Sequence, residues 1–236
     1  MEAAYRRVLI KISGEALAAD KKTGYDFEFV SRVCAAVKSC AEMGVQVGIV
    51  VGGGNFWRGV KDGAGKVERV SADRMGMLAT AMNCLAVADV FKQLGADAKV
   101  MTAVDIQGVG ERYDTKKAIE YLESGKIVLF GCGTGLPFFS TDTAAVLRAA
   151  EIHADAILLA KNIDGVYSDD PRKDPNAEKF DSISYDEVLS RHLAVMDTTA
   201  TSLAMDNSIP VVVFALAEPE NILRVLAGEK LGTEVK

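Results

Sequence analysis

Short runs of apolar, largely β-branched residues alternate with stretches of helical periodicity along almost the whole chain. The runs have the length of strands that are buried on both faces of a sheet. We therefore expect strands at residues 7–12, 45–51, 98–102, 126–130, 156–160 and 211–214. Helices are expected over residues 27–40, between Ser71 and Gly95, over 115–124, from 142, over 186–193 and 197–205, and from 219. This order predicts an α/β fold, a three-layer αβα sandwich around a mostly parallel, twisted sheet.

The length of 236 residues permits one domain or two small ones. One domain over residues 1–236 is the simpler expectation, and no low-complexity linker or internal repeat divides the chain. The composition is 49% hydrophobic and 25% charged, which suffices for a large core. Only residues 162–181, with their prolines and charges, break the alternation. They predict a hairpin or a surface excursion.

Charge and hydropathy exclude several classes of function. A formal net charge of −6 argues against general nucleic-acid binding, which needs a basic face. No apolar run approaches the ~18 residues of a membrane span, and Met1–Arg7 lacks the apolar core of a signal peptide. The protein is therefore expected in the cytoplasm, with no membrane or nucleic-acid partner.

The cysteine and histidine residues show no metal-binding pattern. His153 and His192 stand apart from any ligand spacing, so we expect them to be structural or exposed. The methionines and leucines of residues 75–85 are expected to serve helix packing rather than ligand binding. Reduced thiols packed in the core are expected at all four cysteines, Cys34, Cys40, Cys84 and Cys132.

Ligands of open parallel sheets bind at the carboxyl ends of the strands, so the loops after the strands are the places to search. Four of these loops are unusually polar or rich in glycine. They read Lys11-Ile-Ser-Gly-Glu15, Gly52-Gly-Gly-Asn-Phe-Trp-Arg58-Gly59, Gly131-Cys-Gly-Thr-Gly-Leu-Pro-Phe-Phe-Ser-Thr-Asp142 and Ala160-Lys-Asn-Ile-Asp-Gly-Val-Tyr-Ser-Asp-Asp170.

The residue types in these loops suit phosphoryl transfer, in which fixed donors hold the charge of the moving group. The backbone of Gly52–Gly54 can approach phosphate oxygens closely, and Lys11 can place its ammonium among them. Arg58 offers a planar fork for phosphate, while Asp142 can orient the lysines or hold Mg²⁺ through water. Hydroxyl groups near the helix expected from residue 142 also favour an anion, and they belong to Thr134, Ser140 and Thr141.

Each of these residues has a plainer interpretation when it is taken alone. The glycine triplet is more often a tight turn, Lys11 a surface lysine and Asp142 an ordinary N-cap. Arg58 alone favours a surface salt bridge, and Tyr167 and Asp170 favour turn positions. The chain has no GxxxxGK[ST], no GxGxxG and no protein-kinase catalytic loop. Placement after successive strands is what favours a joint site.

Taken together, five motifs resemble those of the bacterial UMP kinases, a family within the amino-acid kinase superfamily. The resemblance runs from about residue 7 to residue 233, and the motifs at residues 73–83 and 137–139 are the most specific to that family. The five motifs are Lys11-Ile-Ser-Gly-Glu-Ala-Leu17, Val51-Gly-Gly-Gly-Asn-Phe-Trp-Arg-Gly59, Asp73-Arg-Met-Gly-Met-Leu-Ala-Thr80 with Met82-Asn83, Gly133-Thr-Gly-Leu-Pro-Phe-Phe-Ser-Thr-Asp142 and Asp164-Gly-Val-Tyr-Ser-Asp-Asp-Pro171.

The resemblance implies an amino-acid kinase-like fold and a set of binding residues. ATP contacts are implied at Lys11, Ile12, Ser13, Gly14, Gly54, Arg58, Tyr167, Asp170 and either Lys161 or Asn162. UMP contacts are implied at Gly53, Asp73, Thr134, Gly135, Leu136, Pro137, Phe138, Phe139, Ser140 and Thr141. The implied catalytic residues are Lys11, Arg58 and Asp142. No metal site made by the protein alone is implied, because the nucleotide phosphates hold Mg²⁺.

The resemblance further implies transfer of the γ-phosphate of ATP to UMP in pyrimidine nucleotide biosynthesis. The implied enzyme is a Mg²⁺-dependent, allosterically regulated homohexamer that UTP inhibits. Leu136 replaces the usual asparagine, so a side-chain amide contact to uracil is absent. Residues 19–24 lack the glycine-rich character of the family's loop for activation by GTP. Two alternatives stay open: a related kinase that phosphorylates a carboxylate or carbamate, and a nucleotide-binding module without turnover.

Overall fold

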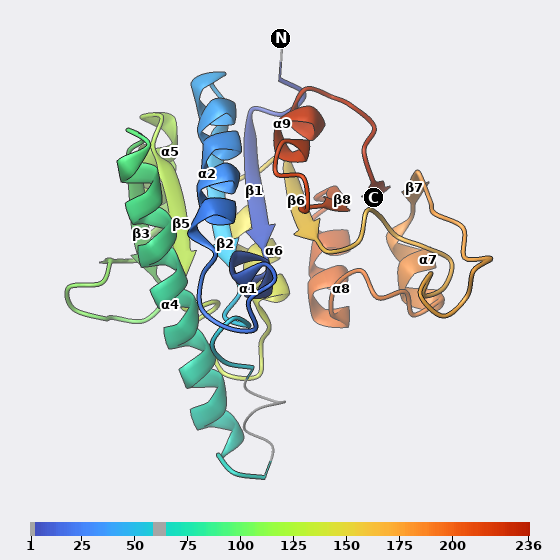
Figure 1. The fold of residues 1–236 in the computed structure, drawn as a ribbon, viewed down its shortest axis with the longest axis horizontal. Coiled ribbons are helices and arrows are strands. Elements are labelled where there is room, and N and C mark those ends of the chain that lie inside the picture. Colours follow the sequence, from blue (N-terminus) through green and yellow to red (C-terminus); the bar gives the residue numbers. More distant parts are fainter. Residues whose placement is uncertain (1–2, 59–64) are drawn as a thin grey trace.

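The structure, a computed structural model, describes residues 3–58 and 65–236. Met1, Glu2 and Gly59, which belong to the expected amino terminus and to the motif at residues 51–59, lie outside the described residues. Within the described part, the chain forms a nine-stranded sheet of order β4-β3-β5-β2-β1-β6-β8-β9-β7 (Figure 1). The strands are β1 (Arg7–Ile12), β2 (Gln46–Val51), β3 (Ala98–Thr102), β4 (Glu111–Arg112), β5 (Ile127–Gly131), β6 (Ala156–Lys161), β7 (Ser182–Ile183), β8 (Val211–Ala215) and β9 (Thr233–Val235).

Neighbouring strands of this sheet run parallel, except that β8 and β9 are antiparallel. This confirms the expected mostly parallel sheet. The described helices are α1 (Gly14–Ala18), α2 (Phe27–Glu42), α4 (Arg69–Gln93), α5 (Thr115–Glu123), α6 (Thr141–Glu151), α7 (Tyr185–Ser190), α8 (Thr198–Asp206) and α9 (Asn221–Leu226).

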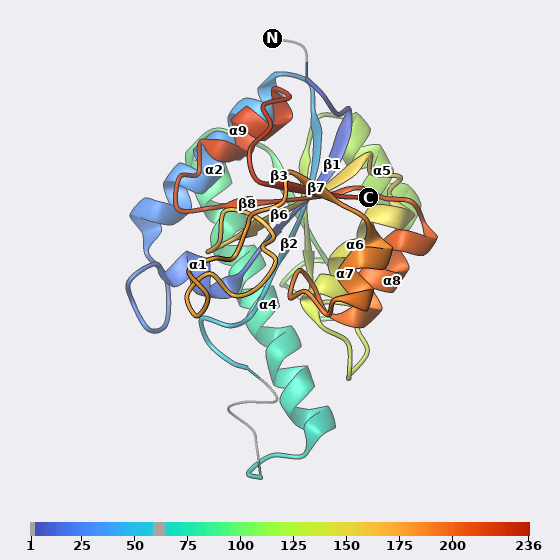
Figure 2. The same cartoon turned by 90° about the vertical axis from the view of Figure 1, so that its right-hand side faces the viewer.

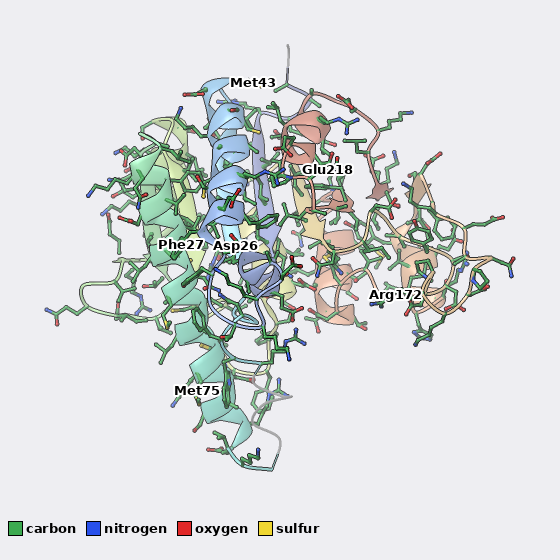
Figure 3. The ribbon with its side chains drawn as sticks, in the orientation of Figure 1. Asp26, Phe27, Met43, Met75, Arg172 and Glu218 are labelled. Carbon is green, nitrogen blue, oxygen red and sulfur yellow. The ribbon has the colours of Figure 1, made fainter. Side chains whose placement is uncertain are left out.

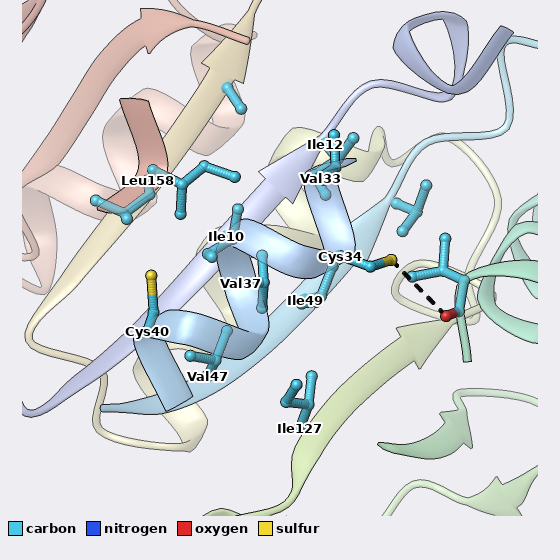
Figure 4. Packing of buried hydrophobic residues seen from close by; sticks show 14 of the residues in the cluster. Ile10, Ile12, Val33, Cys34, Val37, Cys40, Val47, Ile49, Ile127 and Leu158 are labelled. Atoms are coloured by element: carbon cyan, nitrogen blue, oxygen red, sulfur yellow. Dashed lines mark hydrogen bonds between the residues drawn. The ribbon is translucent and has the colours of Figure 1, made fainter. Parts of the chain in front are cut away.

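The helices lie on both faces of the sheet, which confirms the three-layer arrangement (Figure 2). One face carries α1, α2, α4 and α9, and the other carries α5, α6, α7 and α8. On the first face, Val33 and Val37 of α2 pack in one cluster with Ile10 of β1 (Figure 4). On the second face, Leu9 of β1 packs in a cluster with Val146 of α6. Successive residues of a strand point to opposite faces, so β1 contributes to both halves of the core.

Helix α2 begins and packs as the sequence predicts, except that one of its apolar residues is exposed. Asp26 caps α2, and its side chain accepts hydrogen bonds from the N–H groups of Glu28 and Phe29. The apolar stripe of α2 is buried from Val30 onward. Phe27, expected as the first member of that stripe, is instead 56% exposed at the start of the helix (Figure 3). The expectation for Phe27 was wrong: its ring packs beside that of Tyr25, with 5.2 Å between ring centroids, and not in the core.

The outward side of α4 is apolar. Met75 and Leu78 are 40% and 51% exposed, and Met82 and Leu85 are 48% and 42% exposed. Figure 3 shows Met75 on the part of α4 that extends beyond the sheet. The helix packing expected of these four side chains is therefore not made in the core of the chain. By length and composition alone α4 could cross a membrane, but 44% of its apolar window is buried, and a core helix passes the same test.

Several short elements were not expected. The segment after β1, predicted as a loop, contains α1, and the short strands β4, β7 and β9 were missed. Five helix starts also differ from the expected residues: α4 begins at Arg69, α6 at Thr141, α7 at Tyr185, α8 at Thr198 and α9 at Asn221. Strands of two or three residues carry too little periodicity to be detected without their hydrogen-bonded neighbours.

The expectations for cysteine and histidine are confirmed. All four cysteines are free and buried. His153 and His192 are exposed, and both adopt positive φ values, 54° and 52°, just after helices. These positions are helix-ending turns.

Candidate functional site

The four polar loops follow β5, β2, β1 and β6, which are consecutive in the sheet. Because these strands are parallel, their carboxyl ends lie at one edge and bring the loops together (Figure 1). A hollow of about 360 Å³ at this edge is called the central cavity here. Its walls come from the loops after β1, β2 and β5 and from α4: Lys11, Ser13–Glu15, Gly52–Gly54, Trp57, Arg58, Asp73, Gly76, Met77, Thr80, Cys132–Thr134, Leu136 and Phe139–Thr141.

Three charged side chains interact at the ends of β1 and β6 and the start of α6. Lys11 Nζ lies 2.6 Å from Asp142 Oδ1, and both side chains are largely buried. Lys161 Nζ donates to the backbone carbonyl of Val195. Burial lowers the pKa of Lys161, Asp142 acts in the opposite direction, and Lys11 lowers this pKa further. Two lysines with one aspartate form a positive site that suits an anion.

The loops after β1 and β2 approach each other too closely for side chains. A Cβ on Gly14 would lie 2.4 Å from Gly52 O and 2.6 Å from Gly54 N. A Cβ on Gly53 would lie 3.0 Å from the carbonyl oxygen of Gly76 on α4. Glycine is thus required by close backbone packing, and it leaves backbone rather than side chain at the wall of the central cavity.

The loop after β5 is held by α4 at two points. Cys132, at φ 64°, donates its backbone N–H to Thr80 Oγ1 at 2.8 Å. Phe138, at φ 70°, donates its N–H to Asp73 Oδ2 at 2.8 Å. Arg69 donates to the same oxygen at 2.7 Å, and its guanidinium lies 5.0 Å from the centre of the Phe138 ring. Both residues have positive φ, which is uncommon outside glycine, so the loop depends on these anchors for its shape.

The amino terminus of α6 is capped by Ser140, whose Oγ accepts from the N–H groups of Asp142 at 3.0 Å and Thr143 at 3.1 Å. Ser140 Oγ donates to Asp197, which caps α8. Thr143 Oγ1 also donates to Asp197, at 3.2 Å. Asp142 is therefore a residue of the first turn and not the N-cap, and its carboxylate pairs with Lys11.

A second hollow of about 530 Å³, the outer cavity, shares three lining residues with the central cavity. The shared residues are Glu15, Gly54 and Arg58, and Arg58 forms an ion pair with Glu15. A group held at this junction can be reached from both cavities, as transfer between two ligands requires. The remaining walls of the outer cavity are Ala18, Ala19, Asp20, Lys21, Lys22, Thr23, Asn55, Phe56 and Asn162.

Comparison with models of protein families finds one family that matches most of the chain. The sequence profile described as the amino acid kinase family matches residues 6–215. The chain belongs to the amino acid kinase family.

Solved structures with this fold include a UMP kinase from Bacillus anthracis, 37% identical with a TM-score of 0.95, covering 98% of this chain and 96% of that one. A UMP kinase from Ureaplasma parvum is 34% identical with a TM-score of 0.92, covering 98% of each chain. The uridylate kinase from Archaeoglobus fulgidus is 28% identical with a TM-score of 0.76, covering 97% of this chain and 99% of that one. The amino acid kinase fold expected from the sequence is thus confirmed.

The structure places the residues implied to contact ATP in several settings. Lys161 belongs to the charged cluster, whereas Asn162 lines the outer cavity. Ile12 is 1% exposed and packs in the core. Tyr167 and Asp170 line neither cavity. Tyr167 donates a hydrogen bond to Asp164, and Asp170 forms an ion pair with Arg172. Both belong to the segment of residues 162–181, in which a bridge between Tyr167 and Lys179 forms a hairpin. Five residues line the central cavity, Lys11, Ser13, Gly14, Gly54 and Arg58.

The residues implied to contact UMP lie closer together than those implied to contact ATP. Gly135, Pro137 and Phe138 lie on the same loop but outside the lining of the central cavity. Leu136 and Phe139 line that cavity and are 59% and 48% exposed, so an apolar surface is open to a ligand. The members that line the central cavity are Gly53, Asp73, Thr134, Leu136, Phe139, Ser140 and Thr141.

Sequence reasoning missed the residues that support the loops from behind. Thr80 and Asn83 lie on the inward side of α4, and Asn55 follows the glycine triplet. All three stand inside motifs quoted above, but nothing in their spacing showed that they contact one another or the loops. Asp197 was expected as the first residue of a helix, whereas the structure shows it as the N-cap of α8, with bonds to Ser140 and Thr143 that the sequence did not indicate.

Proposed function

We propose that this protein is a nucleoside monophosphate kinase that transfers the γ-phosphate of ATP to UMP, giving ADP and UDP. The observation that carries the proposal is the junction of the central and outer cavities at Glu15, Gly54 and Arg58, with Lys11 in the wall of the central cavity. UMP as the acceptor is supported by two solved UMP kinases, 37% and 34% identical, that each match 98% of this chain.

In this proposal the two nucleotides meet at the junction from opposite sides. UMP occupies the central cavity, against Gly53, Asp73 and residues 134–141. The phosphates of ATP reach the junction through residues 11–14, Gly54 and Arg58, with Lys161, Asn162, Tyr167 and Asp170 on the ATP side. The mixed polar and apolar walls of the central cavity, with Leu136 and Phe139 beside Thr134, support a nucleotide as its ligand.

The proposed chemistry is a direct in-line transfer. A phosphate oxygen of UMP attacks the γ-phosphorus of ATP, a new P–O bond forms, the bond to the β–γ bridging oxygen breaks, and ADP leaves. No general base is needed, because the attacking phosphate oxygen is already ionised. Lys11 and Arg58 stabilise the charge of the moving group, and Asp142 orients Lys11 from 2.6 Å away.

The described side chains can bind a magnesium ion at this site only together with the phosphates of the two nucleotides. Over residues 3–58 and 65–236, no three His, Cys, Asp or Glu side chains form a group that could hold an ion. Mg²⁺ is commonly bound by one or two carboxylates together with substrate phosphates, and the carboxylates beside the proposed phosphate positions are those of Asp142 and Glu15. When bound, the ion would neutralise charge on the phosphate oxygens.

Further parts of the proposal come from the resemblance of the motifs. We propose one domain over residues 1–236 that acts in the cytoplasm in pyrimidine nucleotide biosynthesis, under allosteric regulation with UTP as feedback inhibitor and without membrane or nucleic-acid partners. We also propose a homo-oligomer, a hexamer by that resemblance. The exposed stripe of α4 supports self-association, because neighbouring apolar side chains at helical spacing on a surface are typical of an interface.

An assay of ADP release with ATP and a panel of acceptors tests the function. We expect release with UMP and little with AMP, GMP, acetylglutamate or aspartate. Release with an amino acid alone would assign the chain to a carboxylate or carbamate kinase. Tight binding of ATP without release by any acceptor would contradict enzymatic activity and favour a binding module.

A further inference from the structure

Two buried asparagines form a closed amide pair behind the glycine loop of β2. Asn55 is 2% exposed, and Asn83, near the middle of α4, is 0% exposed. Asn55 Nδ2 donates to Asn83 Oδ1 at 3.0 Å, and Asn83 Nδ2 donates to Asn55 Oδ1 at 2.7 Å. Two reciprocal hydrogen bonds between side chains 28 positions apart hold the loop and the helix in one relative orientation.

The other hydrogen of each side-chain amide goes to the backbone beside the cavities. Asn83 Nδ2 donates to Gly52 O at 2.7 Å, and Asn55 Nδ2 donates to Gly24 O at 3.0 Å. The backbone carbonyl of Asn55 accepts from the Gly24 N–H at 3.2 Å and from Thr23 Oγ1 at 2.9 Å. All four amide hydrogens therefore have acceptors, as buried amides require. The pair joins the glycine loop, α4 and residues 23–24.

These bonds control the orientation of the glycine loop. In a trans peptide, the carbonyl of Gly52 and the N–H of Gly53 point in opposite directions. The bond from Asn83 to Gly52 O therefore directs the Gly53 N–H away from Asn83, and Gly53 lines the central cavity. Glycines restrict φ and ψ very little, so an external anchor must supply the order of this loop.

We infer that Asn55 and Asn83 are positioning residues for phosphoryl transfer. They hold the backbone of residues 52–54 at the junction of the two cavities, and they link that backbone to residues 23–24, of which Thr23 lines the outer cavity. They act through the loop rather than by contact with the reacting atoms. The inference rests on the proposed function, since it requires phosphate groups at the junction.

The test compares Asn83→Ala, the double variant Asn55→Leu/Asn83→Leu and the control Cys84→Ala. Cys84 follows Asn83 on α4 and is also 0% exposed, so the control removes buried volume from the same helix without releasing Gly52 O. The double variant removes both amides together, so that neither asparagine side chain is left buried without its amide partner. The measurements are kcat, KM for ATP and UMP, the thermal unfolding midpoint and hydrogen exchange over residues 50–58.

We expect kcat to fall about a hundredfold in both asparagine variants, as is typical when reacting groups are displaced by about 1 Å. The KM values should change less than kcat, and hydrogen exchange over residues 50–58 should rise. Cys84→Ala should keep kcat within about twofold of wild type, with unchanged exchange in that segment.

A folded asparagine variant with kcat within about twofold of wild type would overturn the inference. Failure of both asparagine variants to fold would overturn it too, because the pair would then serve stability rather than positioning. If the wild type makes no UDP, the proposed function fails by itself. Hydrogen exchange still decides the positioning role in that case, because unchanged exchange over residues 50–58 in Asn83→Ala would contradict it.

Discussion

Lys11, Lys161 and Asp142 show at the residue scale how the fold prepares a site for phosphate. All three belong to elements whose ends meet at one edge of the sheet, and Asp142 partly offsets the repulsion between the two lysines. The cluster keeps excess positive charge in a partly buried place, where electrostatic interactions are stronger than in water. An arriving polyphosphate would supply the missing negative charge.

Replacement of Lys11 tests the role of this charge. Lys11→Ala should lower kcat by about 10²- to 10³-fold, the range found when one preorganised donor to a developing charge is removed. The fold should persist, which circular dichroism can check. Lys38→Ala is a matched control, because Lys38 lies in the carboxyl-terminal half of α2, pairs with Glu42 and lines neither cavity. A Lys11→Ala enzyme with a near-normal rate would remove Lys11 from the mechanism.

Lys161 should make stability depend on pH in a defined direction. Burial lowers its pKa below the usual 10.5, so the unfolded state binds more protons between the lowered pKa and 10.5. Stability therefore rises with pH through that window. Urea unfolding at about pH 8 and about pH 10 should show wild type gaining free energy of unfolding relative to Lys161→Met. A constant difference between the two proteins would contradict the lowered pKa.

At the scale of elements, the loops of the site are held by helices that belong to other parts of the chain. α4 anchors the loops after β2 and β5 through Asn83, Thr80 and Asp73. α8 holds the start of α6 through Asp197. Each loop is thus bonded to a rigid element that is distant in sequence, which is how a glycine-rich site keeps one shape.

Asp197→Ala tests the link between α8 and α6. Loss of the N-cap should cost about 1 kcal/mol of stability. Loss of the bonds to Ser140 and Thr143 should also raise KM for UMP about tenfold, equivalent to about 1.4 kcal/mol of binding. Asp114→Ala is the matched control, since Asp114 caps α5 with the same type of bond, to Lys117 N–H, and lies outside the cavity walls. Equal KM values in the two variants would contradict a role for Asp197 at the site.

At the scale of the whole molecule, α4 has two different sides. Its inward side carries Asn83 and Thr80, and its outward side carries Met75, Leu78, Met82 and Leu85. Any partner that covers the outward stripe would rest on the same helix that anchors the glycine loops. Self-association and the order of the site are therefore expected to be coupled.

Leu78→Glu tests self-association through this stripe. A charge in a buried apolar contact is costly, so the variant should give a smaller species than wild type in light scattering after size-exclusion chromatography. Lys230→Glu is the control, because it adds negative charge at an exposed position away from α4. An unchanged mass for Leu78→Glu would show that the stripe is not an interface.

The sequence predicted most of the sheet and most of the loops that form the site. Strands such as β1, β5 and β8 were found because a strand buried on both faces reads as a local apolar run. The loops were found because the carboxyl ends of parallel strands must share an edge. The short strands β4, β7 and β9 were missed because two or three residues become a strand only when a neighbour supplies hydrogen bonds.

By itself the sequence determined the alternation of elements, the character of the core and the residue types available for phosphate, since these depend on local periodicity and side-chain chemistry. Only the tertiary structure decided that Asn55 bonds Asn83, that Asp197 holds Ser140 and that the stripe of α4 faces outward. Those outcomes depend on which distant segments become neighbours. Contacts between distant segments arise from the packing of the whole chain, which no local pattern records.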